Sequence, residues 1–368
     1  MAIRYKRITV KVGSNVLTKD DGSLNVSRIA HLVDQIAFLH KQGVEVILVT
    51  SGAVAAGKAV LTPLKKTDAV SAKQLWAALG QVKLMNRYSD FFHEHNLVCA
   101  QILLTKENFS SRNHYLNMKN CLSTLLENKV IPVVNENDSI SITELMFTDN
   151  DELSGLITAM ASSDALIILT NVDGVFNTHP GEVNATLYHE IYANEIHPED
   201  IINTKVSGFG RGGMATKFRI AQKVAGDGID VHVANGMRDK ILIDLMDTTQ
   251  IVEHTHFVPH SRTTSGVKKW IGYSESFAKG KLYINQGAEK ALLSEKAVSL
   301  LPVGVSKVEG IFKKGDLVMI YNESSELIGM GKARFSSDRF ESEKSAGKQK
   351  PIIHYDYLYL GAIRSNTN

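Results

Sequence analysis

The chain has 368 residues, of which 43% are hydrophobic and 22% are charged. These proportions are ordinary for a globular protein, and no long apolar run predicts a membrane-spanning helix. Because a single hydrophobic core stops growing at about 250–300 residues, this length predicts two domains. The two cysteines, Cys99 and Cys121, lie inside apolar patterns and lack a metal-binding spacing. We therefore expect buried thiols in a reduced compartment, the cytoplasm.

The net charge of +2 is unevenly distributed along the chain. Residues 1–261 carry 24 Lys and Arg against 28 Asp and Glu, whereas residues 262–368 carry 17 against 11. A basic C-terminal part is typical of a nucleic-acid-binding face, and a solvated lysine surface explains it equally well. The charge alone leaves both interpretations open.

From the N-terminus to about residue 247, short apolar runs rich in β-branched residues alternate with apolar residues at helical spacing. The first predicted helix has Ser27 as its cap and Gly43 as its stop. The predicted strands are 8–12, 44–49, 97–104, 130–134, 165–170 and 229–234. The later predicted helices are 71–95, 112–127, 151–162 and 214–226. This alternation predicts a three-layer αβα sandwich around a mainly parallel sheet, with helices on both faces.

Beyond about residue 250 the sequence predicts a small β-rich module. Its short apolar runs, 281–284, 316–321 and 355–360, are separated by glycine-bearing turns. The charged, serine-rich stretch 336–350 is predicted to be a mobile loop. The expected organisation is a larger domain over 1–260, a linker over 261–276 and the β-rich domain over 277–362.

A glycine run between Ser207 and Lys217 has four glycines in six positions, directly before a predicted helix. Glycine lets backbone N–H groups approach an anion, and a helix start adds further donors, so the run is typical of a phosphate-binding loop. It satisfies G-x-G-x-x-G, yet no buried strand precedes it, which disfavours a dinucleotide site. The Gly-Lys-Ser/Thr ending of a P-loop is missing as well. The alternative is a flexible loop before an ordinary helix.

Polar residues gather where the predicted strands end, which is where open parallel sheets bind ligands. The segments concerned are 11–15, 50–57, 135–138, 149–151 and 170–175. Each has a structural alternative: Lys11 also suits a surface lysine, and Asp149 and Asp151 also suit helix caps. Together, lysines, glycine turns and carboxylates at one sheet edge favour phosphoryl transfer, which depends on charge neutralisation and positioning.

Six segments, taken in order, resemble the motif set of the amino-acid kinase superfamily and, within it, the glutamate 5-kinase family most closely. The segments are 11–14, 49–57, 133–138, 149–151, 169–174 and 210–217. The β-rich part resembles the PUA domain that many bacterial members carry, which implies a small β-rich barrel, so the resemblance covers essentially the whole chain. It implies that ATP, with Mg²⁺, phosphorylates the side-chain carboxylate of L-glutamate to L-glutamyl 5-phosphate, the first step of proline biosynthesis.

The resemblance also implies roles for the matching residues. Lys11 and Lys217 would contact the transferring phosphoryl group, and Asp151 would orient both lysines. Glutamate would be held by Ser51, Gly52, Asp138 and Asn150. The ATP site would be lined by Lys11, Thr170, Asn171, Arg211, Gly212, Gly213, Met214, Ala215, Thr216 and Lys217. No residue is implied as a metal ligand. The family often has Asp in place of Asn171 and Thr in place of Arg211. These two differences put the expected nucleotide contacts in doubt more than the reaction.

The implied partners are glutamate, ATP, proline as a feedback inhibitor near the glutamate site, a second copy of the chain in a dimer or tetramer, and a downstream glutamyl phosphate reductase. No membrane partner is expected. The near alternatives are kinases of this fold that act on aspartate, N-acetylglutamate, carbamate or UMP. An RNA-binding protein is the alternative of another class. The basic C-terminal part and the tyrosines of 355–359 favour it, although alternating tyrosines equally fit a buried sheet face.

Overall fold

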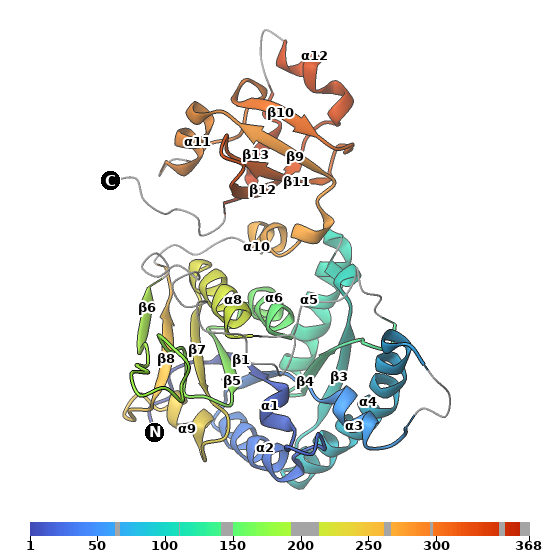
Figure 1. Ribbon diagram of the computed structural model, residues 1–368, viewed down its shortest axis with the longest axis vertical. Coiled ribbons are helices and arrows are strands. Elements are labelled where there is room, and N and C mark those ends of the chain that lie inside the picture. The colour runs from blue at the N-terminus through green and yellow to red at the C-terminus, as the bar shows by residue number, and fades with distance from the viewer. Residues whose placement is uncertain are drawn as a thin grey trace. The chain divides into compact units, whose positions relative to one another are not determined.

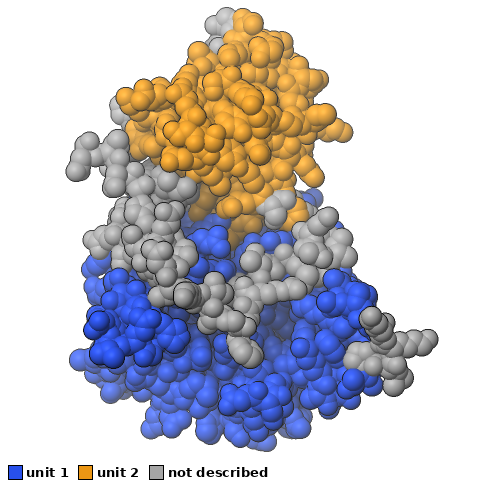
Figure 2. All heavy atoms as spheres, viewed as in Figure 1, with its two compact units in different colours: residues 1–261 blue, residues 262–368 orange. Residues whose placement is uncertain are grey.

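The computed structural model describes residues 1–62, 67–109, 111–140, 150–192, 213–260, 266–294, 297–345 and 350–360. The chain forms two compact units, residues 1–261 and 262–368 (Figures 1 and 2). Within the described ranges, no helix is both long enough and apolar enough to cross a membrane.

The first unit is built around an eight-stranded sheet with the order β3-β4-β2-β1-β5-β7-β8-β6. Neighbouring strands run parallel except β7 and β8, which are antiparallel, so the predicted mainly parallel sheet is confirmed. The strands are β1 (Arg7–Val12), β2 (Glu45–Val49), β3 (Cys99–Leu104), β4 (Ile131–Glu136), β5 (Ala165–Thr170), β6 (Glu190–Tyr192), β7 (Asp230–Asn235) and β8 (His254–Val258).

Helices cover both faces of this sheet, as Figure 1 shows. The α1, α2, α3, α4 and α9 helices share one core with alternate strand residues such as Val10, whereas α5, α6 and α8 pack on the opposite face. Because successive strand side chains point to opposite faces, Lys11 is directed toward the α6 and α8 layer. The helices are α1 (Ser14–Leu17), α2 (Val26–Lys41), α3 (Ala53–Lys58), α4 (Ala69–Glu94), α5 (Arg112–Glu127), α6 (Asn150–Ala161), α8 (Met214–Gly226) and α9 (Ile241–Met246).

Two details of the first unit differ from the expectations. Asn25 caps α2, because its side chain accepts a hydrogen bond from the Arg28 N–H, and Ser27 lies inside the helix. Cys99 is half-buried on β3, and Cys121 is exposed on α5 instead of buried. The apolar pattern around Cys121 belongs to the buried face of the amphipathic helix, and the cysteine lies off that face.

The α3 and α4 helices cross at unusually close range. A Cβ atom added at Gly57 would lie 1.8 Å from the Trp76 carbonyl oxygen, and one added at Gly80 would lie 1.7 Å from the Ala53 carbonyl oxygen. Only glycine permits this backbone-to-backbone contact at both positions. The crossing fixes the turn before α3 against the start of α4, and both contribute to the site described below.

The second unit contains a five-stranded sheet with the order β10-β9-β11-β12-β13, which confirms the predicted β-rich domain. The strands are β9 (Gly280–Ile284), β10 (Val305–Glu309), β11 (Leu317–Tyr321), β12 (Leu327–Ala333) and β13 (Ile353–Leu360). The helices are α10 (Gly266–Gly272), α11 (Gln286–Leu293) and α12 (Phe340–Lys344). The stretch predicted as a mobile loop therefore contains a helix, whose Phe340 is buried in the core of this unit. The range expected to be a linker contains α10.

Candidate active site

A cavity of about 630 Å³ lies where β1, β2, β4 and β5 end. Eight of the residues expected to form the site line it: Lys11, Ser51, Gly52, Asp138, Asn150, Asp151, Thr170 and Lys217. Five more are described but do not line it: Asn171, Gly213, Met214, Ala215 and Thr216. Arg211 and Gly212 lie outside the described residues. The structure thus gathers the residues expected around the reacting groups and glutamate, and leaves five of the eight described ATP residues outside this cavity.

A buried carboxylate joins two lysines at one end of the cavity. Asp151 Oδ1 lies 2.5 Å from Lys11 Nζ, and Asp151 Oδ2 accepts a hydrogen bond of 2.9 Å from Lys217 Nζ. The exposed fractions of the three side chains are 5% for Lys11, 9% for Lys217 and 0% for Asp151. Burial by itself raises the pKa of Asp151, but the two neighbouring ammonium groups outweigh it and hold the pKa below its ordinary value. The site therefore combines two cations with one ionised carboxylate.

Three different elements bring these charges together. Lys11 belongs to the central strand β1, Asp151 to the first turn of α6, and Lys217 to the first turn of α8. The residue before α8, Gly213, has extended backbone and supplies no side-chain cap. The start of α8 consequently offers backbone N–H donors and the positive end of the helix dipole beside Lys217, an arrangement suited to anions.

Asn150 organises the middle of the cavity. Its Nδ2 donates to the Thr50 carbonyl and to Ser51 Oγ, both at 2.9 Å, and to Asn135 Oδ1 at 3.1 Å. Asn135 in turn donates to Gln81 Oε1 at 2.9 Å. The Oδ1 of Asn150 is buried and has no hydrogen-bond partner among the described residues. This oxygen is an acceptor that a bound ligand could satisfy.

The turn between β2 and α3 requires glycine. Gly52 has φ of 97°, in the left-handed region that L side chains rarely adopt, and an added Cβ would lie 3.2 Å from Leu24 Cδ2. This conformation places Ser51 against Asn150 and starts α3 directly afterwards.

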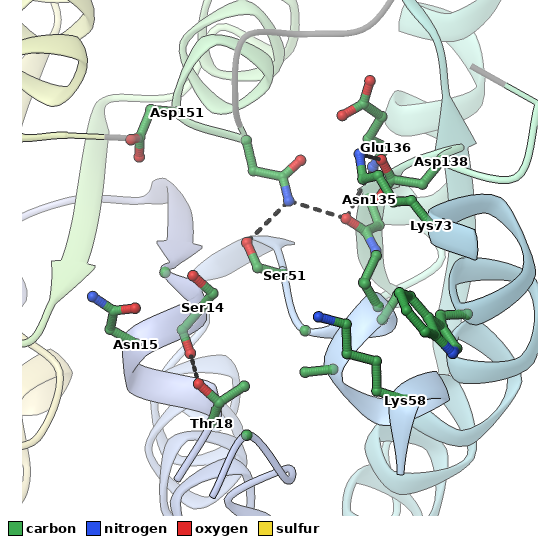
Figure 3. A pocket seen from close by; sticks show the side chains of 18 of the residues that line it. Ser14, Asn15, Thr18, Ser51, Lys58, Lys73, Asn135, Glu136, Asp138 and Asp151 are labelled. Atoms are coloured by element: carbon green, nitrogen blue, oxygen red, sulfur yellow. Dashed lines mark hydrogen bonds and ion pairs between the residues drawn. The ribbon is translucent and has the colours of Figure 1, made fainter. Parts of the chain in front are cut away.

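The far end of the cavity carries a second ion pair. Lys73 Nζ contacts Asp138 Oδ1, and the side chains are 25% and 14% exposed. Figure 3 shows this pair beside Glu136, with Ser51 between it and Asp151. Lys58 lies over the Trp76 ring, 4.9 Å from its centroid.

Comparisons with known proteins identify a family for each of the two units. A family model described as "Amino acid kinase family" matches residues 6–235, which is more than half of the chain. The chain belongs to the amino acid kinase family. A second model, described as "PUA domain", matches residues 280–355 of the β-rich unit.

Several members of the amino acid kinase family resemble the chain over its whole length. A protein named glutamate 5-kinase from Bacteroides thetaiotaomicron is 52% identical over 98% of this chain and 100% of its own. One of the same name from Chlorobaculum tepidum is 46% identical over 97% of this chain and 98% of its own. A third, from Trichlorobacter lovleyi, is 40% identical over 97% of both chains.

Within this kinase unit, the sequence analysis missed Lys58, Lys73 and Trp76. All three line the cavity, but they belong to α3 and α4 instead of to strand ends. Their positions depend on the close crossing of these helices. The glycines at 57 and 80 were the available signal, since isolated glycines inside helices often mark close packing.

A second cluster of ionisable groups lies away from the cavity, on β7 and β8. Asp230, His232 and His256 have potential metal-ligand atoms within 4.8 Å of one another. Hydrogen bonds already account for this arrangement: His256 Nε2 lies 2.7 Å from Asp230 Oδ1, and Tyr5 OH lies 2.8 Å from His232 Nε2. Burial, followed by the nearby His256 and His254, holds the pKa of His232 well below its ordinary value. We interpret the cluster as a hydrogen-bonded network.

Proposed function

We propose that the chain is an ATP-dependent glutamate 5-kinase, which phosphorylates the side-chain carboxylate of L-glutamate to give L-glutamyl 5-phosphate. The buried arrangement of Lys11, Asp151 and Lys217 is the observation that carries this proposal. Two ammonium groups against one carboxylate leave a positive excess in a site almost closed to water, where charge stabilisation is strong. The relatives named glutamate 5-kinase support the choice of substrate.

The chemistry needs little beyond positioning and charge. A glutamate carboxylate has a reference pKa of about 4.3, so it is already an ionised nucleophile at neutral pH. One carboxylate oxygen forms a bond to the γ-phosphorus, the bond from that phosphorus to the β–γ bridging oxygen breaks, and the electron pair leaves with ADP. Lys11 and Lys217 would stabilise the charge on the transferring group. Ser51, Gly52, Asp138 and Asn150 would hold the glutamate.

Mg²⁺ fits this site as a companion of the nucleotide. Asp151 is already engaged by two ammonium groups, so the ion would be held mainly by phosphate oxygens and water, as is common for Mg²⁺ with nucleotides. When bound, it would neutralise phosphate charge. Thr170, Asn171 and residues 211–217 would contact the ATP.

The direct test is a hydroxamate assay. Incubation with ATP, Mg²⁺, L-glutamate and hydroxylamine should give γ-glutamyl hydroxamate, and Lys217→Ala should abolish it because a buried cation is lost. A panel of aspartate, N-acetylglutamate, carbamate and UMP, followed by ADP release, tests the related substrates. Failure to form hydroxamate above the level of the Lys217→Ala variant would refute the proposal.

The finer expectations belong to the same proposal. Proline would inhibit near the glutamate site, the chain would form a dimer or tetramer through the kinase unit, the product would pass to a glutamyl phosphate reductase, and the enzyme would work in the cytoplasm. Activity that is unchanged at high proline would refute inhibition by proline. The mass of the protein in solution tests the expected dimer or tetramer.

RNA binding by the β-rich unit is a second candidate function, favoured by one observation. Tyr283 and Tyr321 stack with ring centroids 5.5 Å apart, and Lys307 and Lys281 lie over these rings. Aromatic and basic side chains on an open sheet suit stacked bases. Tight binding of RNA by the full chain that weakens steeply with salt would support this function.

A further inference from the structure

Lys73 is a charged residue of the cavity that the proposed reaction does not use. It lies on α4, contacts Asp138 in the turn after β4, and lines the cavity with it. Figure 3 shows the pair on the right of the view and Asp151 of the buried cluster on the left. Because the cost of removing both charges from water offsets much of their attraction, a pair with 25% and 14% exposed side chains is not explained by stability alone.

The partner of Lys73 is Asp138, one of the residues proposed to hold glutamate, and its carboxylate suits the α-ammonium group of that substrate. A bound ammonium at Asp138 would compete directly with the Lys73 ammonium for the same oxygen. If Lys73 were displaced without a new partner, a cation three-quarters removed from solvent would be left unpaired, which is unfavourable. Binding is therefore favourable only where the ligand itself supplies a replacement anion.

An α-amino acid supplies both charges one carbon atom apart. Its ammonium can take the place of Lys73 at Asp138, and its α-carboxylate can then pair with Lys73. The buried Oδ1 of Asn150, which lacks a hydrogen-bond partner among the described residues, is a further acceptor for the ammonium. After this exchange each charge has a partner of opposite sign.

We propose that Lys73 and Asp138 form an exchangeable pair that recognises the zwitterionic head group of an α-amino acid, with Lys73 binding the α-carboxylate. The inference rests on the proposed function, since it assigns the specificity of the same site. Lys73 is here a specificity residue that does not touch the transferring phosphoryl group. Ligands with only one of the two charges leave either Lys73 or Asp138 unpaired.

The primary test is the kinetics of Lys73→Met in the full-length protein. We expect KM for L-glutamate to rise about 10- to 100-fold, the loss of one charge-assisted hydrogen bond. We expect kcat and KM for ATP to stay unchanged, because the buried lysines are untouched. Lys73→Arg should restore most of the affinity. Lys83→Met, an exposed change on the same helix, should match the unmodified chain. A glutamate KM unchanged in Lys73→Met would overturn the inference.

A second test separates α-carboxylate binding from a purely structural role. 4-Aminobutyrate keeps the ammonium and the reacting carboxylate of glutamate but lacks the α-carboxylate. If Lys73 binds that group, Lys73→Met should reduce kcat/KM for glutamate and not for 4-aminobutyrate, measured by turnover or by competitive inhibition. Equal losses for both ligands would show that Lys73 only positions Asp138. If the unmodified chain makes no γ-glutamyl hydroxamate, the proposed function itself fails; if it does and the preference is unchanged, only this inference fails.

Discussion

The two ends of the cavity hold their charges in different ways. Lys11, Asp151 and Lys217 are almost completely buried and held by three separate elements, whereas Lys73 and Asp138 are partly exposed and form an ion pair with each other. A buried network is costly to rearrange, and a partly exposed pair is not. We infer that the first end is organised in advance for charge development, and that the second end exchanges partners when a ligand binds.

The strongest test of the organised end is Asp151→Asn. The change leaves two buried ammonium groups without their shared carboxylate, so we expect kcat to fall by about 10³-fold. We also expect the free energy of unfolding to fall by about 3–5 kcal/mol. Hydroxamate formation and urea unfolding measure the two effects. Asp90→Asn, on the exposed side of α4, is the matched control. Full activity in Asp151→Asn would refute the organising role.

The helix crossing that connects the two ends can be broken at Gly80. In Gly80→Ala the new Cβ would overlap the Ala53 carbonyl, and α3 and α4 would have to separate. We expect a loss of about 1–3 kcal/mol in the free energy of unfolding, together with a higher KM for glutamate. Val82→Ala, at a position 61% exposed, should change stability by less than about 0.5 kcal/mol. If Gly80→Ala is equally harmless, the close crossing does not hold the site.

The exchangeable end can be examined with proline, which carries the same pair of head-group charges. If proline binds there, Lys73→Met should raise its inhibition constant by about 10-fold or more, in parallel with the KM for glutamate. Steady-state inhibition at several glutamate concentrations gives both constants. If the inhibition constant of proline stays unchanged while the KM for glutamate rises, proline does not bind at the Lys73–Asp138 pair.

The histidine network provides a contrast, because burial disfavours the charged form of His232. The pKa of His232 is lowered in the folded chain, while the unfolded chain takes up a proton near pH 6.5. The unfolded state thus binds more protons below that pH, and stability falls on acidification, by about 1 kcal/mol at pH 5.5. Thermal unfolding at pH 7.5 and 5.5 should show this difference. The loss of stability between pH 7.5 and pH 5.5 should shrink in His232→Gln and persist in His31→Gln, an exposed control. An equal loss in both variants would show that His232 is not its cause.

Strand ends proved the most predictable part of the molecule. Lys11 and Thr170 follow from short apolar runs, and the residues after them reach one edge because the strands are parallel. The helices 112–127 and 214–226 and the strand 165–170 were predicted with the bounds that the structure has, since the spacing of apolar residues is clear there.

Helix-borne residues were less predictable. Lys73 is one charge within a long amphipathic pattern, and its contact with Asp138 depends on how α4 sits against α3 and β4. That arrangement comes from the close approach at Gly57 and Gly80, a tertiary contact that no local pattern specifies. The helix within 336–350 was missed because charged and serine residues surround the buried Phe340.

The position of Lys11 within the sheet has a thermodynamic consequence. Its backbone pairs with Val49 on one side and with Ile168 on the other, in the middle of the eight strands. Amides at such positions exchange with solvent only when the whole cooperative unit opens. Local fraying therefore cannot remove this lysine from the cavity, and inactivation by heat should follow the global unfolding of the first unit. A stabilising substitution anywhere in that core would then extend the lifetime of activity.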